Sequence, residues 1–157
     1  MQGYDVAQIC LNGHVTNSSI RDFPHHNQEY CNICGTKTVT ACQGCQKKIR
    51  GRLRGVLTIE PMSAPAFCQH CGKPFPWTEA RIEAARDLAD QLGLDVPDRT
   101  LLEKSIDELL RDSPRAPAEA VRFRTILCRA KPWGLEAFKQ VLGMILSEGV
   151  KKLIWPA

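Results

Sequence analysis

The sequence lacks a long hydrophobic run. No apolar stretch approaches the roughly 20 residues that a membrane-spanning helix needs. No basic segment followed by an apolar one opens the chain, so we expect no secretory signal. Paired carboxylates, a phosphate-binding glycine loop and a nucleophile elbow are missing too. We therefore expect a cytoplasmic protein that is not an enzyme.

Cysteine, by contrast, is concentrated in the first half of the chain. Seven of the eight cysteines lie there, and six of them form three Cys-x-x-Cys pairs. The seventh is followed four residues later by a histidine. Disulfides use even numbers of cysteines, and a chain without an export signal favours metal ligands. The predicted ligands of two tetrahedral zinc ions are Cys10, His14, Cys31, Cys34, Cys42, Cys45, Cys68 and Cys71.

Four such ligand pairs can share two ions in three ways. Sequential pairing puts the ligands of residues 10–34 in one site and those of residues 42–71 in the other. We favour it because the gap within each site can hold strands and a turn. Cross-brace and nested pairings remain alternatives. Sites with four protein ligands have no open position for water or substrate, so we expect them to be structural.

Two details of the ligand set stay open. His25 or His26 could replace His14 in the first site, although neither has the short spacing to Cys10. The site with four cysteines could hold iron instead of zinc. Cys128 stands alone in a helical stretch and is expected to be a small buried hydrophobe.

Short strands are expected between the cysteine pairs. Residues 38–40 are rich in β-branched side chains, and so are residues 55–59, which precede a loop from Pro61 to Pro65. Glycine follows the second cysteine of two pairs, where a positive φ is common. Residues 1–77 therefore have the outline of two zinc ribbons in tandem.

The densest basic run lies between the second and third cysteine pairs. Phosphate contact, as in nucleic-acid binding, is one interpretation. A solvated strand face is the other, and we favour it because the run alternates with Ile49, Leu53 and glycines and has no aromatic residue for base stacking. The candidate nucleic-acid-binding residues are Lys47, Lys48, Arg50, Arg52 and Arg54.

Net charge does not identify a partner. The formal value is +4. Seven bound thiolates would add seven negative charges and two zinc ions would return four positive ones, which leaves the loaded protein at about +1.

Residues 78–157 are expected to form about four helices. Thr78 is a candidate N-cap for the first, and Gly93 is placed to end it. Thr100 and Glu103 match a capping box at the start of the second. Prolines in residues 113–117 predict a linker. The third helix is expected over residues 118–131, and the fourth from Gly134 towards Trp155.

The fourth helix is amphipathic. Packing against the protein's own helices is the default interpretation of its apolar face. Docking on a partner or on a second copy of the chain is an alternative, and so is lying in a membrane interface, for which Lys139, Lys151, Lys152 and Trp155 are suited. The residues of this face are Phe138, Val141, Leu142, Ile145, Leu146 and Leu153.

Several motifs in the first half resemble a family of bacterial proteins. They are Cys31–Gly35, Ala41–Cys45, Ile49–Gly51 and Phe67–Trp77. The proteins of that family have an N-terminal double zinc ribbon, a helical C-terminal half and no known function. The C-terminal half of the present chain resembles the family only in being helical. The resemblance implies a bacterial cytoplasmic zinc-ribbon protein and supplies no catalytic residue.

The sequence thus predicts an α+β protein, with tandem zinc ribbons over residues 1–77 and an α-helical domain over residues 78–157. The expected function is that of a zinc-binding protein-interaction adaptor, with partner docking or self-association through its helices. A nucleic-acid-binding ribbon that uses the basic run is the alternative. A membrane-associating effector that uses the last helix is the second alternative.

Overall fold

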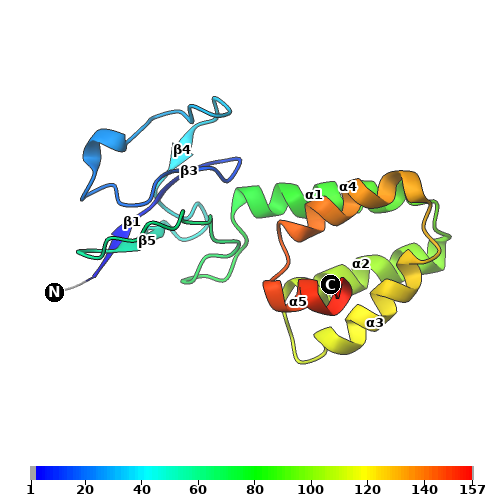
Figure 1. Ribbon diagram of the computed structural model, residues 1–157. Helices are drawn as coiled ribbons and strands as arrows, with labels where there is room; N and C mark the ends of the chain where they lie inside the picture. Colours follow the sequence, from blue (N-terminus) through cyan, green and yellow to red (C-terminus); the bar gives the residue numbers. More distant parts are fainter. Residues whose placement is uncertain (1–2, 157) are drawn as a thin grey trace. The chain divides into compact units, whose positions relative to one another are not determined.

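The computed structural model describes residues 3–156 (Figure 1). Over this part of the chain, residues form two compact units, the first ending at Glu79 and the second beginning at Ala80. Short antiparallel strands and two cysteine clusters belong to the first unit, and helices make up the second. The α+β class expected from the sequence is therefore confirmed.

The first unit contains two small sheets. One pairs β1 with β5, and the other has the order β3-β2-β4, all antiparallel. In the second sheet Ile9 lies between Val15 and Val39. The strands are β1 (Tyr4–Val6), β2 (Gln8–Cys10), β3 (Val15–Asn17), β4 (Thr38–Val39) and β5 (Arg50–Leu53).

The hydrophobic core of this unit is small, and cysteines form part of it. Phe75 stacks on Trp77, with ring centroids 4.6 Å apart, and the Trp77 Nε1–H donates to the Pro65 carbonyl at 2.8 Å. The buried cluster consists of Ala7, Ile9, Cys42, Ile49, Cys68, Phe75 and Trp77. Strands of two to four residues around so few apolar side chains bury little surface, so the unit depends on further cross-links.

One of the two expected strands is present. A strand was expected over residues 38–40, and β4 forms there over Thr38–Val39. The prediction of a strand over residues 55–59 is wrong: this segment is irregular, and Leu57 and Ile59 are 95% and 101% exposed. Its β-branched side chains suit a strand, but no neighbouring strand pairs with it among the described residues. Strand formation depends on such pairing and not on composition alone.

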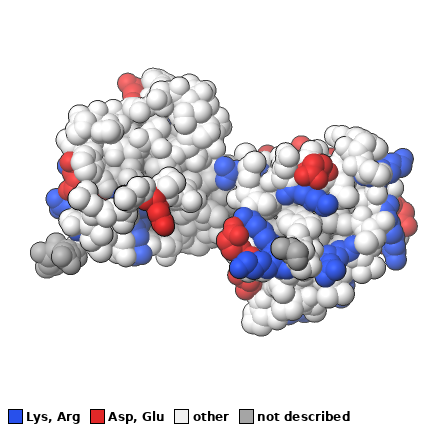
Figure 2. Space-filling model, viewed as in Figure 1, with Lys and Arg blue, Asp and Glu red and all other residues white. Residues whose placement is uncertain are grey.

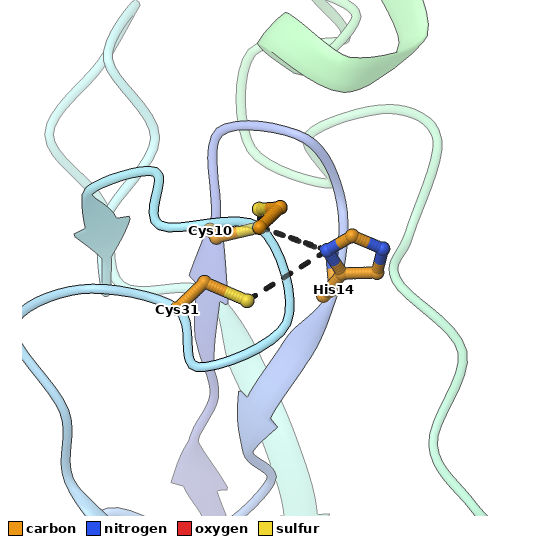
Figure 3. Close-up of side chains that lie close together, drawn as sticks. Cys10, His14 and Cys31 are labelled. Carbon is orange, nitrogen blue, oxygen red and sulfur yellow. Dashed lines mark hydrogen bonds between the residues drawn. The ribbon is translucent and has the colours of Figure 1, made fainter.

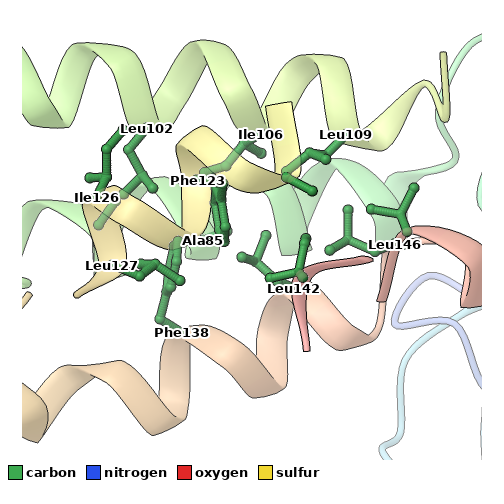
Figure 4. Close-up of a cluster of buried hydrophobic side chains, with 14 of the residues drawn as sticks. Ala85, Leu102, Ile106, Leu109, Phe123, Ile126, Leu127, Phe138, Leu142 and Leu146 are labelled. Carbon is green, nitrogen blue, oxygen red and sulfur yellow. The ribbon is translucent and has the colours of Figure 1, made fainter. Parts of the chain in front are cut away.

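The second unit is built from five α-helices, where about four were expected. Phe123 and Phe138 stack near the middle of its core with centroids 6.1 Å apart, and Leu142 is fully buried with them (Figure 4). The helices are α1 (Pro76–Asp90), α2 (Val96–Leu110), α3 (Ala116–Leu127), α4 (Pro132–Gly143) and α5 (Glu148–Ile154).

Two helix starts differ from the predictions. α1 begins at Pro76, and Thr78 is buried inside its first turn instead of capping it. α2 is capped by Asp95, whose side chain accepts the Asp98 N–H at 2.8 Å. Thr100 lies within α2, where its hydroxyl donates to a backbone carbonyl, so the predicted capping box is wrong. In both helices a proline in the first turn sets the earlier start.

The prediction of one long fourth helix is also wrong. α4 ends at Gly143, and α5 starts after Ser147, whose Oγ accepts the Val150 N–H at 3.2 Å. This serine cap makes a new helix start more favourable than a continuous helix. The expected linker is shorter than residues 113–117, because α3 already begins at Ala116. It is a turn within the helical unit.

Candidate metal centres

Two clusters of four side chains bring together all eight predicted ligands. Within each cluster, the donor atoms all lie within 4.8 Å of one another. The grouping is the sequential one, and the cross-brace and nested alternatives do not occur. The clusters are Cys10, His14, Cys31 and Cys34 in the first, and Cys42, Cys45, Cys68 and Cys71 in the second.

The first cluster is built where β2 turns into β3. The Sγ of Cys10 lies 3.5 Å from the Nδ1 of His14, and the Sγ of Cys31 lies 3.7 Å from the same nitrogen (Figure 3). The sulfurs of Cys10 and Cys34 are 3.7 Å apart. The turn between Cys10 and His14 contains Gly13, with φ of 89°, and closes with a Gly13 N–H donating to the Cys10 carbonyl at 2.8 Å. The four-residue spacing thus brings His14 next to Cys10, as the sequence suggested.

The second cluster has four sulfurs. The Sγ atoms of Cys42 and Cys71 are 3.8 Å apart, and those of Cys45 and Cys68 are 3.7 Å apart. A disulfide would bring two sulfurs to about 2.05 Å, so none of these pairs is bonded.

These separations fit a tetrahedral ion in each cluster. Bonds of about 2.3 Å to sulfur and about 2.0–2.1 Å to nitrogen, at the tetrahedral angle, place two sulfurs about 3.8 Å apart and a sulfur about 3.6 Å from a nitrogen. The distances in the structure, 3.7 to 3.8 Å between sulfurs and 3.5 to 3.7 Å between sulfur and nitrogen, agree with that geometry. Each cluster can therefore hold one metal ion.

Three cysteine turns share the same backbone hydrogen bonds. The Cys31 carbonyl accepts the Gly35 N–H at 2.8 Å, and the Cys31 N–H donates to the Thr36 carbonyl at 2.8 Å. The turns that start at Cys42 and Cys68 repeat both bonds, with distances between 2.8 and 2.9 Å. In each turn the first bond joins the first cysteine to the residue four positions later, which directly follows the second cysteine.

The residue after each second cysteine adopts a left-handed conformation. Gly35 and Gly72 have φ of 71° and 72°, as their position in the sequence suggested. In the middle turn the corresponding residue is Gln46, with φ of 62°, and not the internal Gly44. A side chain in this conformation costs roughly 1–2 kcal/mol. The shape of the turn is thus the same with or without a glycine there.

Hydrogen bonds to sulfur favour the thiolate form at two ligands. The hydroxyl and N–H of Thr36 lower the pKa of Cys34 to about 5. The N–H groups of His70 and Cys71 lower the pKa of Cys68 to about 7. Donors aimed at a sulfur stabilise its negative charge. Thr36 was not among the residues expected from the sequence, and its position two residues after a ligand cysteine is the signal that could have identified it.

Two other ligands resist ionisation. Burial raises the pKa of Cys10. The Lys47 N–H favours the thiolate of Cys45, but burial and the three neighbouring thiols raise its pKa to about 11. Four adjacent thiols cannot all ionise without a positive charge between them. A bound cation would supply that charge and convert each cluster fully to its ligand form.

The alternative histidine ligands are excluded. His25 and His26 lie in a short 3-10 helix (Pro24–His26), where both are exposed and pack edge-on against Phe23 with centroids 6.2 and 6.1 Å away. Neither belongs to the first cluster. The short turn after Cys10 instead brings the His14 ring next to the sulfurs of the first cluster.

The basic run, residues 47–54, contains β5 and the residues on either side of it. One face of this strand is largely exposed to solvent. Three of the five cations are engaged within the first unit. Arg50 lies 4.2 Å above the Tyr4 ring centroid, and Arg54 forms an ion pair with Asp22 at 3.0 Å. The Arg52 guanidinium donates to the carbonyls of residues 58 and 60. Lys47 and Lys48 are exposed and form no ion pair within residues 3–156.

Most residues of the apolar face that was a candidate for docking are buried. Phe138, Leu142, Ile145 and Leu146 are at most 6% exposed, and Val141 packs against the same core. Leu153 is the exception, at 38%. The partner and membrane interpretations of this face are therefore corrected, because its own unit covers it. No described helix is long and apolar enough to cross a membrane.

Cys128 is exposed, so the prediction that it is buried is wrong. It is the C-cap of α3, where the helix ends and its side chain leaves the packed face.

The chain matches the model of a protein family. The family model matches residues 3–154 and is described as an uncharacterised protein conserved in bacteria, DUF2321. The chain belongs to this family. The match extends over both units, whereas the resemblance noted in the sequence was specific only to the first half. The description of DUF2321 names no metal and no activity. No curated protein and no solved structure matches the chain.

Proposed function

We propose that this DUF2321 protein binds two zinc ions and that its first unit is a double zinc ribbon. The observation that carries the proposal is the pair of closed donor sets, each with tetrahedral spacing. Thiolate and imidazole donors in sets of Cys₃His and Cys₄ are typical of structural zinc. Four protein ligands leave no open position at either ion, so the ions stabilise the fold and do not act as catalytic centres.

The size of the first unit supports a structural role for the metal. Its buried cluster has seven residues, and two of these are the ligands Cys42 and Cys68. A small β unit buries too little apolar surface to offset the entropy of its loops. Metal binding adds free energy to the folded state because the ligand set exists only there.

We further propose that the protein acts by binding another protein in the bacterial cytoplasm, where free thiols persist. Large apolar side chains on the first unit support this role. Ile33 is 70% exposed, and Leu57 and Ile59 are almost completely exposed. Exposed apolar groups that gather into a patch are typical of interaction surfaces. The helical unit offers less support, since its strongest apolar face is buried.

Metal analysis tests the zinc proposal directly. The protein is purified from its native cells without added metal, and zinc, iron and chain concentrations are measured together. Two zinc ions per chain are expected, and one after Cys34→Ser or Cys71→Ser. Stoichiometric iron, or no metal at all, would overturn the proposal. Capture of bound molecules from the same cells, before and after nuclease treatment, tests the binding role: a protein partner retained after nuclease supports it, and recovery of nucleic acid alone rejects it.

A further inference from the structure

A groove in the first unit lies beside the second metal cluster and encloses about 270 Å³. Residues 47–52 form one wall, and residues 62–70 supply most of the other. The two segments are far enough apart in the sequence that neither suggests the other. Four of the lining residues are basic and none is acidic.

Both walls are held by the cysteine turns of the second cluster. The Lys47 carbonyl accepts the Cys42 N–H at 2.9 Å, and Phe67 pairs with Pro74 across the turn that starts at Cys68. Ile49 is fixed further by its N–H, which donates to the Thr40 carbonyl at 2.9 Å. A metal ion in the second cluster would therefore hold one wall against the other. Such a preformed groove loses little entropy when a ligand enters.

The floor of the groove is apolar. Ile49 and Phe75 are 3% and 4% exposed and lie at its base, while Met62 and Pro65 are half-buried at its side. Phe67 is 39% exposed. Methionine adapts its shape to different apolar side chains and is frequent at peptide-binding surfaces. The floor thus suits one or two apolar side chains of a partner.

The rim of the groove is positive. Lys47 and Lys48 have no acidic partner within residues 3–156, so their charges are available to a ligand. A zinc ion with four thiolates carries a formal charge of −2 nearby, which the four basic residues of the lining exceed. A ligand with carboxylates beside its apolar group is electrostatically complementary to this arrangement.

We infer that the groove binds a short acidic segment of a partner protein. One apolar side chain of that segment occupies the floor, and its carboxylates lie at Lys47 and Lys48. The inference rests on the proposed protein-binding function and states the chemistry of the partner at that same unit.

Single-stranded nucleic acid fits the groove less well. Its affinity depends on neutralising several phosphates and on stacking bases against aromatic faces. Arg50, Arg52 and Arg54 are already engaged, and Phe75 is covered by Trp77. Among the lining residues only Phe67 and His70 present exposed rings, which is a small surface for stacking several bases. On the face drawn in Figure 2 the first unit carries few charged side chains and no broad basic surface.

The test uses the zinc-loaded full chain and a fluorescent peptide in which Leu and Phe alternate with Asp and Glu. Fluorescence anisotropy is expected to show binding. Lys47→Glu with Lys48→Glu is expected to weaken it about tenfold, from lost attraction and added repulsion at two sites. Met62→Gln is expected to weaken it about fivefold through lost apolar contact.

Matched controls separate the groove from general charge and from folding. Arg21→Glu with Lys37→Glu changes the net charge equally at exposed positions outside the groove and is expected to leave the affinity unchanged. Peptides with Lys in place of the acids, or with Ser in place of Leu and Phe, are expected not to bind. Each variant must retain two zinc ions and the wild-type melting temperature.

Three results would overturn the inference. One is no peptide binding up to about 1 mM, and another is equal weakening by the control pair. The third is tighter binding of a fluorescent oligothymidine that the lysine changes abolish, which would assign the groove to nucleic acid. Loss of the inference with two zinc ions still present would leave the zinc proposal intact, whereas absence of zinc would remove both.

Discussion

The sulfur of Cys10, at the end of β2, lies 3.7 Å from the sulfur of Cys34, 24 residues further along the chain. That distance matches two ligands of one tetrahedral ion and excludes a disulfide. A metal ion bound to both sulfurs would close the loop between them without a disulfide. Such a closure is reversible, so the stability of the first unit would then depend on the available metal.

Metal removal is predicted to unfold the first unit and to leave the second folded. The second unit has a buried cluster of seventeen residues, none of them a metal ligand, against seven in the first. Hydrogen exchange measured after treatment with a strong chelator should show lost protection over residues 3–79 and retained protection over residues 80–156. Restored protection after zinc is added back is the control. Equal loss in both units would contradict the prediction.

Gln46→Gly is predicted to stabilise the protein. Gln46 holds a φ of 62°, which costs a side chain roughly 1–2 kcal/mol but costs glycine little. The free energy of unfolding of the zinc-loaded protein should rise by about 1 kcal/mol in denaturant titration. Gln43→Gly, in the same turn but with ordinary φ, is the matched control and should give no gain. Gly35→Ala should lower the stability by a similar amount, because its φ is 71°.

Asp5→Asn is predicted to destabilise the first unit at neutral pH. Asp5 is 2% exposed, and although burial opposes its charge, the N–H groups of Val6, Asp22 and Arg21 lower its pKa below 3.8. A lowered pKa in the folded state gives stability that is fully present above the unfolded pKa of about 3.9 and is lost as the pH falls through the folded value. At pH 7 the ionised form therefore contributes fully, and its loss should cost about 2 kcal/mol.

Chemical unfolding of the zinc-loaded protein at pH 7 measures this effect. Asp22→Asn is the control, since it removes only a partly exposed ion pair with Arg54 and should cost less than about 1 kcal/mol. An Asp5→Asn variant as stable as the wild type would show that its backbone donors do not require a charge.

Asp95→Ala is predicted to destabilise the second unit, and Thr100→Ala is not. The Asp95 carboxylate caps α2, whereas Thr100 lies in the second turn with an exposed side chain. Loss of a helix cap costs about 1 kcal/mol. Thermal unfolding should separate the two variants by several degrees. The reverse order of stabilities would restore the capping box expected from the sequence.

Local spacing predicts the parts of the site that depend on neighbours in sequence. Cys31 and Cys34 are two ligands on one turn because two intervening residues allow only a narrow range of shapes, and Gly35 follows for the same reason. His14 reaches the first cluster because Gly13 lets the chain turn. These features can be recognised from a few consecutive residues. Helix positions were less well predicted, since Thr78 and Thr100 resemble caps as closely as Asp95 does.

Contacts between distant segments could not be predicted in this way. The strand-like residues 55–59 have no pairing strand among the described residues. The helix expected from Gly134 to Trp155 ends at Gly143, and Ser147 caps a separate helix. The groove brings Lys47 and Met62, fifteen positions apart in the sequence, to one lining beside the second cluster. Nothing in the sequence of either wall predicts that it lies beside the other wall.

The sequence by itself determined the ligand types, their short spacings, the basic strand and the helical character of the second half, because each depends on residues a few positions apart. The tertiary structure alone decided that the ligand pairs combine in sequence order and that the apolar face of α4 turns inward. It also decided that the basic residues border an apolar groove. These features depend on which segments pack together, and packing is a property of the whole unit.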